Sequence, residues 1–125
     1  MEIKSIKEIY NDFDKGNEFI GYLATRYDRR KSFYKKAKVY KVGNYIALMS
    51  YDTIVAKVEK VGNIIGAQVF GYYSATTRRH TNELLDQFDI KAPTAKELKN
   101  TDGKGEYRWT EVSTYKNLLD YLCFE

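Results

Sequence analysis

The chain has few of the residues that build disulfide frameworks and metal centres. Its 125 residues include one cysteine, Cys123, and one histidine, His80. A single cysteine excludes a disulfide framework and a cysteine-based zinc site, and it fits a reducing compartment. A single histidine excludes a metal site made of clustered histidines, so we expect no metal and no cofactor.

Long apolar runs are also missing. The N-terminal stretch MEIKSIKEIY has no apolar core of signal-peptide length, and no segment approaches the ~20 apolar residues of a membrane span. We therefore expect a cytoplasmic protein with no membrane partner. The length and the 43% hydrophobic content predict that residues 1–125 form a single domain with a core of its own.

Sequence motifs of common enzymes are absent as well. There is no glycine-rich phosphate loop, no pair of histidines and no G-x-S-x-G elbow. Cys123, in LDYLCFE, is expected to be a packed thiol. These absences favour a protein that binds over one that catalyses. A weaker alternative is a small metal-independent nuclease, with His80 as the base and with Lys31, Tyr73 and Arg79 at the phosphate.

Basic charge is concentrated in one segment. The net charge of the chain is +4, but residues 26–41 carry eight lysines and arginines against one acid, Asp28. Aromatic residues interleave with these cations, a pattern typical of proteins that contact phosphates and stack on bases. The alternative is that Phe33 and Tyr40 belong to the core and the charges only solvate a loop. The expected contact residues of this segment are Arg29, Arg30, Lys31, Tyr34, Lys35 and Lys36.

A second candidate site is the stretch GYYSATTRRH, at the start of a helix predicted over residues 77–88. An arginine in the first turn of a helix opposes the helix dipole, at a cost of roughly 0.3–1 kcal/mol when it is exposed. An anion bound at the helix start would remove that cost. The expected anion site comprises Ser74, Thr76 and Thr77, with Arg78, Arg79 and His80 as contacts to nucleic acid or another partner.

Two other interpretations of this stretch remain open. The anion could be a carboxylate of the protein itself, with Asp28 and Asp52 as candidates, or Arg79 could simply face solvent. His80 lies at the edge of the helix stripe centred on Leu84, Leu85 and Phe88, where a histidine is usually a hydrogen-bonded neighbour of the core.

The pattern of the chain predicts an α+β fold. Residues 3–13 have the apolar spacing of a helix, and residues 18–37 fit no clear period and are expected to form a loop with short elements. A small antiparallel meander of about four strands follows, and residues 106–112 could add a fifth. In TIVAKVEK the alternation predicts one buried face and one wet face. Further helices are expected over residues 94–100, where Thr94 and Glu97 have capping-box spacing, and from residue 113 onward.

Three segments together resemble a family of small uncharacterised proteins from phages, prophages and plasmids of Gram-positive bacteria. They are YDRRKSFYKKAKV, ALMSYDTIVAKV and GYYSATTRRHTNELLDQF, which follow the family pattern D-S-R-K-S-F-Y, S-Y-x-T-x-V-A and Y-S-x-T-T-x-R-H. Arg29, Lys35, Thr81 and Leu84 depart from it. The resemblance implies a mobile-element origin, and hence a bacterial host cell, but no reaction.

The implied origin and the composition together favour two candidate binding functions. The first is contact with nucleic acid or a nucleoprotein complex through the two basic segments. The second is stoichiometric inhibition of a host defence protein, such as an immune nuclease, because tyrosine and arginine often anchor protein interfaces and the chain has 12 tyrosines. A homodimer is compatible with either function, since a small meander leaves its edge strands exposed.

Overall fold

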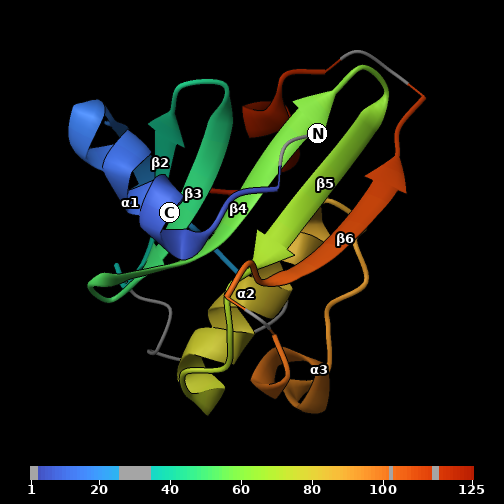
Figure 1. Cartoon of the computed structure of the whole chain (residues 1–125). Helices are drawn as coiled ribbons and strands as arrows, with labels where there is room; N and C mark the ends of the chain where they lie inside the picture. The colour runs from blue at the N-terminus through green and yellow to red at the C-terminus, as the bar shows by residue number, and fades with distance from the viewer. Residues whose placement is uncertain (1–2, 26–34, 102, 114–115) are drawn as a thin grey trace.

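The computed structural model of the chain describes residues 3–25, 35–101, 103–113 and 116–125. In this part of the chain six strands form one antiparallel sheet, in which each strand pairs with the next one in sequence (Figure 1). The α+β class is confirmed, but the meander has six strands, more than the four or five expected. The strands are β1 (Glu18–Tyr22), β2 (Ala37–Val42), β3 (Tyr45–Ser50), β4 (Thr53–Val61), β5 (Ile64–Val69) and β6 (Glu106–Glu111).

Glycine starts two of the tight turns between these strands. Gly43 and Gly62 have φ angles of 58° and 59°, a region that glycine enters without steric cost. Each glycine is followed by asparagine, and the flanking strand residues pair directly, as in a two-residue hairpin. The Gly-Asn signals in the sequence therefore mark real turns.

Two segments differ from the sequence expectation. Residues expected to form a loop contain β1, which pairs with β2 despite a bulge between Phe19 and Gly21. The helix expected from residue 113 is not formed in the described residues, which instead contain a short 3-10 helix, η2 (Leu118–Tyr121). Phe124 then forms a bridge with Leu23, because the end of β1 offers backbone groups that the C-terminal residues can pair with.

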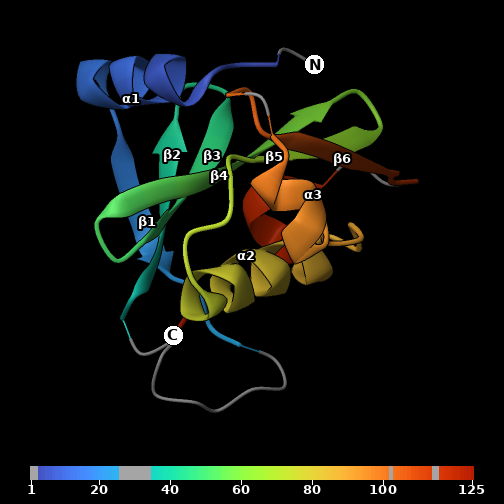
Figure 2. The same ribbon diagram turned by 60° about the horizontal axis from the view of Figure 1, so that its bottom comes forward.

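Helices cover both faces of the sheet (Figure 2). On one face lie α2 (Ala75–Gln87), α3 (Ala95–Lys99) and η2, and on the other lies α1 (Ile6–Lys15). The helices α1 and α3 begin with capping boxes, Ser5 with Glu8 and, as expected, Thr94 with Glu97. No helix in the described ranges is long and apolar enough to cross a membrane.

The strand β4 is buried on both faces, contrary to the predicted wet face. Lys57 and Glu59 alternate with Ala56 and Val58, yet they are only 1% and 6% exposed. Their side chains form an ion pair with an Nζ–Oε2 distance of 3.2 Å. The alternation of polar and apolar residues correctly predicted a strand. In this fold, however, the face that carries Lys57 and Glu59 is buried as well.

Candidate functional site

The helix α2 begins with an open N-terminus. Ser74 caps it, and its Oγ accepts a hydrogen bond from the N–H of Thr77 at 3.1 Å. The first turn contains no acidic residue, although a negative charge would be favourable there. Ser74 is exposed, so the start of the helix reaches the surface as the sequence predicted.

A buried hydrogen-bonded cluster joins the start of α2 to the end of β3. The Oγ of Ser50 lies 2.7 Å from Nδ1 of His80 and 3.0 Å from Oγ1 of Thr77. All three side chains are buried, and His80 is 0% exposed. The structure thus places His80 as a hydrogen-bonded neighbour of the core, and neither His80 nor Thr77 is open to direct contact with a partner, contrary to the contact expected of them.

The turn that follows Ser50 holds a tyrosine in an unusual conformation. Tyr51 has a φ of 55°, in the left-handed region where Gly43 and Gly62 start the other two turns. A bulky residue in this region is a steric outlier, and such outliers gather at functional sites. Yet Tyr51 remains 41% exposed, so burial of its side chain does not account for the choice of residue.

Two lysines of the basic segment contact Tyr51. The Nζ of Lys36 lies 5.3 Å from the centroid of the tyrosine ring. The Nζ of Lys38 donates to the backbone oxygen of Tyr51 at 3.0 Å and is 4.0 Å from the fully exposed carboxylate of Asp52. The backbone N–H of Tyr51 donates to the oxygen of Lys36 at 2.9 Å. On its inner side the ring lies 5.8 Å from the ring of His80.

These contacts bring the two predicted segments together at one end of the sheet. Lys36 and Lys38 come from the basic segment, and Ser74 from the helix start. The link between them is the turn of Ser50 and Tyr51. We call the exposed part of this region the turn surface: Lys36, Lys38, Tyr51 and Ser74.

The two arginines of α2 are not part of this group of contacts. Nη2 of Arg79 donates to Oγ1 of Thr76 at 3.2 Å. Arg79 lines a cleft of about 380 Å³ on the outer side of α2, together with Asn82, Glu83, Asp86, Ile90, Lys91 and Ala92. Within the described ranges, no carboxylate lies within 4.0 Å of Arg78 or Arg79. Asp52 is therefore not the partner of Arg79.

Several predicted residues cannot be placed in this arrangement. Arg29, Arg30, Lys31 and Tyr34 lie outside the described residues, as does Asp28, the other carboxylate proposed for Arg79. Lys35 is described and exposed, and its backbone N–H donates to a carboxylate oxygen of Glu125 at 3.3 Å.

The arrangement expected of a nuclease is not assembled by the residues that the structure describes. His80 is buried, and its Nδ1 forms a hydrogen bond with Oγ of Ser50. Tyr73 lies near Tyr10 of α1, and burial, followed by the proximity of Tyr10, raises the pKa of Tyr73 above its ordinary value. Across the described ranges, no group of three or more histidine, cysteine or acidic side chains could hold a metal ion.

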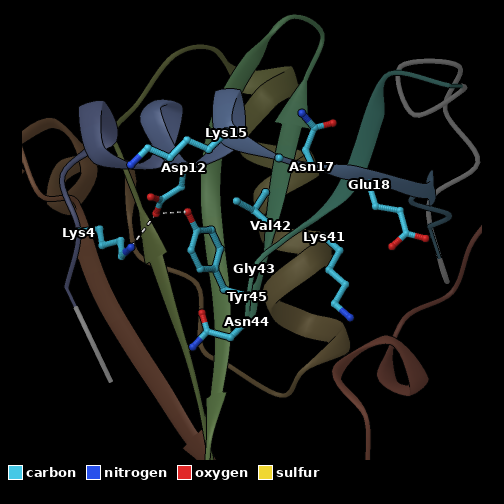
Figure 3. A pocket seen from close by; sticks show the side chains of 11 residues that line it. Lys4, Asp12, Lys15, Asn17, Glu18, Lys41, Val42, Gly43, Asn44 and Tyr45 are labelled. Atoms are coloured by element: carbon cyan, nitrogen blue, oxygen red, sulfur yellow. Dashed lines mark hydrogen bonds and ion pairs between the residues drawn. The ribbon is translucent and has the colours of Figure 1, made fainter.

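A hollow of about 580 Å³ lies at the other end of β3, beside the β2–β3 turn (Figure 3). Two of its charged groups form an ion pair: Oδ2 of Asp12 is 2.6 Å from Nζ of Lys4, and it also accepts a hydrogen bond from the hydroxyl of Tyr45 at 2.8 Å. The hydrogen bonds from Lys4 and then Tyr45 hold the pKa of Asp12 below its usual range. This network explains the hollow as a structural feature between α1 and the sheet.

Sequence reasoning did not single out Tyr51 as a site residue. A signal was present, because the other two tight turns of the meander are Gly-Asn, whereas this one is Tyr-Asp. A tyrosine at a turn position that favours glycine indicates that the side chain is needed there.

The fold and the turn surface define an α+β protein with a six-stranded meander and one basic, aromatic end. Residues 22–102 match a family of unknown function, DUF8033, and the chain belongs to that family. No curated protein and no solved structure matches the chain. The match includes the turn surface, and it ends before β6.

Proposed function

We propose that the protein binds nucleic acid, alone or within a nucleoprotein complex, through the turn surface. The observation that carries this proposal is Tyr51, an exposed aromatic residue in a conformation that favours glycine, placed between two lysines. Aromatic rings beside cations stack on bases and contact phosphates at the same time, which suits single-stranded nucleic acid.

The start of α2 supports the same function. Exposed N–H groups at a helix start bind phosphate, and the hydroxyl of Ser74 lies beside them. The cluster of Ser50, His80 and Thr77 acts beneath the surface as a positioning group, because it fixes the start of α2 against the turn that carries Tyr51. In this proposal His80 has no direct contact with the partner.

The setting proposed for this activity is that of an accessory protein from a phage, prophage or plasmid, acting by binding in the cytoplasm of a bacterial host. The three sequence blocks that resemble such proteins support this origin. All three include residues of the turn surface: YDRRKSFYKKAKV contains Lys36 and Lys38, ALMSYDTIVAKV contains Tyr51, and GYYSATTRRHTNELLDQF contains Ser74.

Fluorescence polarisation with short single- and double-stranded DNA and RNA tests the proposal. Affinity should be micromolar or better at about 50 mM salt and fall by a large factor at about 200 mM, because phosphate binding releases counterions. Absence of binding to all four probes at the lower salt concentration would refute it.

Two substitutions locate the site. Tyr51→Gly should weaken binding while the free energy of unfolding stays the same or rises, because glycine adopts the φ of 55° without strain. Lys36→Gln should weaken binding to every sequence and lower the salt slope by about one. Lys116→Gln is the matched control, because Lys116 is also an exposed lysine but lies at the other end of the sheet, and it should change neither quantity.

Arg79→Glu shows whether the surface extends over α2. If Arg79 contributes, affinity at low salt should fall although the fold is intact. If only Lys36 and Tyr51 matter, the contact is confined to the turn and the helix start.

The alternative function is inhibition of a host defence protein. Tyr72 and Tyr73 support it, because both are large, exposed aromatic side chains just before α2, 37% and 46% exposed. In that case the protein forms a stable one-to-one complex with its target, and this complex survives salt that abolishes phosphate binding.

A further inference from the structure

The two edges of the sheet differ in how well they are protected. The edge strand β1 has a bulge, and its last residues pair with the C-terminal segment: the N–H of Glu125 donates to the oxygen of Tyr22 at 2.9 Å, and the N–H of Ala24 to that of Cys123 at 2.9 Å. The other edge strand, β6, pairs with β5 on one side, and no strand of the described residues lies beyond it (Figure 1).

The hydrogen-bond pattern tells which backbone groups of β6 point outward. The N–H of Val112 donates to the oxygen of Asn63, which continues the register of β5 and β6. Alternation then directs the N–H and C=O groups of Glu106, Arg108 and Thr110 toward β5. Those of Tyr107, Trp109 and Glu111 point away from the sheet, and none of these three residues has a backbone partner there among the described residues.

The strand β6 carries the charged residues Glu106, Arg108 and Glu111, but it lacks three other devices that usually block an edge. Residues 106–111 include no proline, no lysine and no bulge. The central residue, Trp109, is 56% exposed, the highest value among the large hydrophobic residues of the described chain. An open, regular edge with an exposed tryptophan is a site for a further strand.

From this edge we infer that two copies of the chain pair through β6 to form a symmetric dimer with a continuous sheet. A second copy is the partner that this strand fits, because the outward groups of Tyr107, Trp109 and Glu111 can pair with the same groups of a two-fold related strand. Pairing of β6 with β1 of another copy would give an open filament, and the bulge and the C-terminal residues oppose it.

Charge selects the register of this pairing. Centring the two-fold axis on Arg108 would place two arginines directly opposite each other, which is destabilising. Centring it on Trp109 places Tyr107 opposite the Glu111 position and Arg108 opposite the Thr110 position. This register avoids like charges, overlaps most of β6 and packs the two tryptophans against each other, which lowers their exposure to water.

The test is sedimentation equilibrium of the full chain over about 1–300 µM, since the dimer fraction depends on protomer concentration. Trp109 is the only tryptophan, so its fluorescence reports on the interface directly. As the dimer forms, the emission maximum should move to shorter wavelength and acrylamide quenching should fall. Both changes should follow the same concentration dependence as the mass.

Two variants address the edge itself. Trp109→Lys places a charge on the axis and should give a monomer across the range. Glu111→Pro removes an outward N–H without touching the bonds to β5, keeps the tryptophan, and should raise the Kd of the dimer roughly tenfold or more, because each half of the ladder loses a hydrogen bond.

Phe19→Lys is the matched control, because Phe19 is 45% exposed on the opposite edge, and it should leave the dimer unchanged. A wild-type chain that stays monomeric at every concentration, with Trp109 accessible to acrylamide, would overturn the inference and leave this edge for a strand from another protein. A dimer abolished by Phe19→Lys and kept by Trp109→Lys would equally overturn it. The nucleic-acid proposal is tested separately, since the turn surface includes no residue of β6.

Discussion

The two faces of the sheet differ in the kinds of side chain that they bury. The face toward α2 and α3 is mainly apolar, with Val58, Ile65, Leu84, Leu85 and Phe88 in one buried cluster, and its buried polar residues Ser50, Thr77 and His80 form hydrogen bonds with one another. The face toward α1 has a smaller apolar cluster, and beside it the ion pair of Lys57 and Glu59 is buried. An apolar face needs volume and shape, whereas a face that buries charge needs every partner in place.

Removing one half of the ion pair should have the largest effect. Glu59→Leu removes the carboxylate that lies 3.2 Å from the ammonium of Lys57, which is 1% exposed, and should lower the free energy of unfolding by about 3–5 kcal/mol. Urea denaturation measures this loss.

The double variant Lys57→Met/Glu59→Leu is the control for that loss. It removes both charges and should recover most of the stability, because two apolar side chains no longer require a partner. If Glu59→Leu alone lowers stability by less than about 1 kcal/mol, as surface pairs do, water reaches the pair and this face is not a closed core.

Truncating an apolar side chain should have a similar or slightly smaller effect on each face. Leu85→Ala, in α2, and Ile9→Ala, in α1, each remove a 0% exposed aliphatic side chain and should each lower the free energy of unfolding by about 2–5 kcal/mol. The same urea titrations compare them. A loss below about 1 kcal/mol for Ile9→Ala alone would show that α1 is only loosely held against the sheet.

The sequence predicted most of the apolar face and little of the charged one. Helical spacing identified Leu84, Leu85 and Phe88 as buried, and Gly-Asn pairs located two turns of the meander. The strand β1 was missed because its residues EFIGY show no alternation, and its pairing with β2 comes from a distant part of the chain. Lys57 and Glu59 were expected to be wet, since the period of a strand does not tell what covers each face.

The candidate site could be predicted only in part for a similar reason. Ser74 at a helix start, and a cluster of lysines, are local patterns. The position of Tyr51 against His80, and of Ser50 against Thr77, depends on how α2 packs on the end of β3, which no local pattern contains.

Protonating the carboxylate of Asp12, in α1, should have the smallest effect. The pKa of Asp12 is lowered in the folded state, first by the hydrogen bond from Lys4 and then by that from Tyr45. This stabilisation is complete above the ordinary pKa of 3.8 and is lost as the pH falls through the lower folded value. Because the pair is partly exposed, the loss should be about 1 kcal/mol or less. Urea titrations at neutral pH and below pH 4 measure it, with Asp12→Asn as the variant that should lose this part of the pH dependence. An unchanged pH dependence in Asp12→Asn would place the acid-sensitive group elsewhere in the protein.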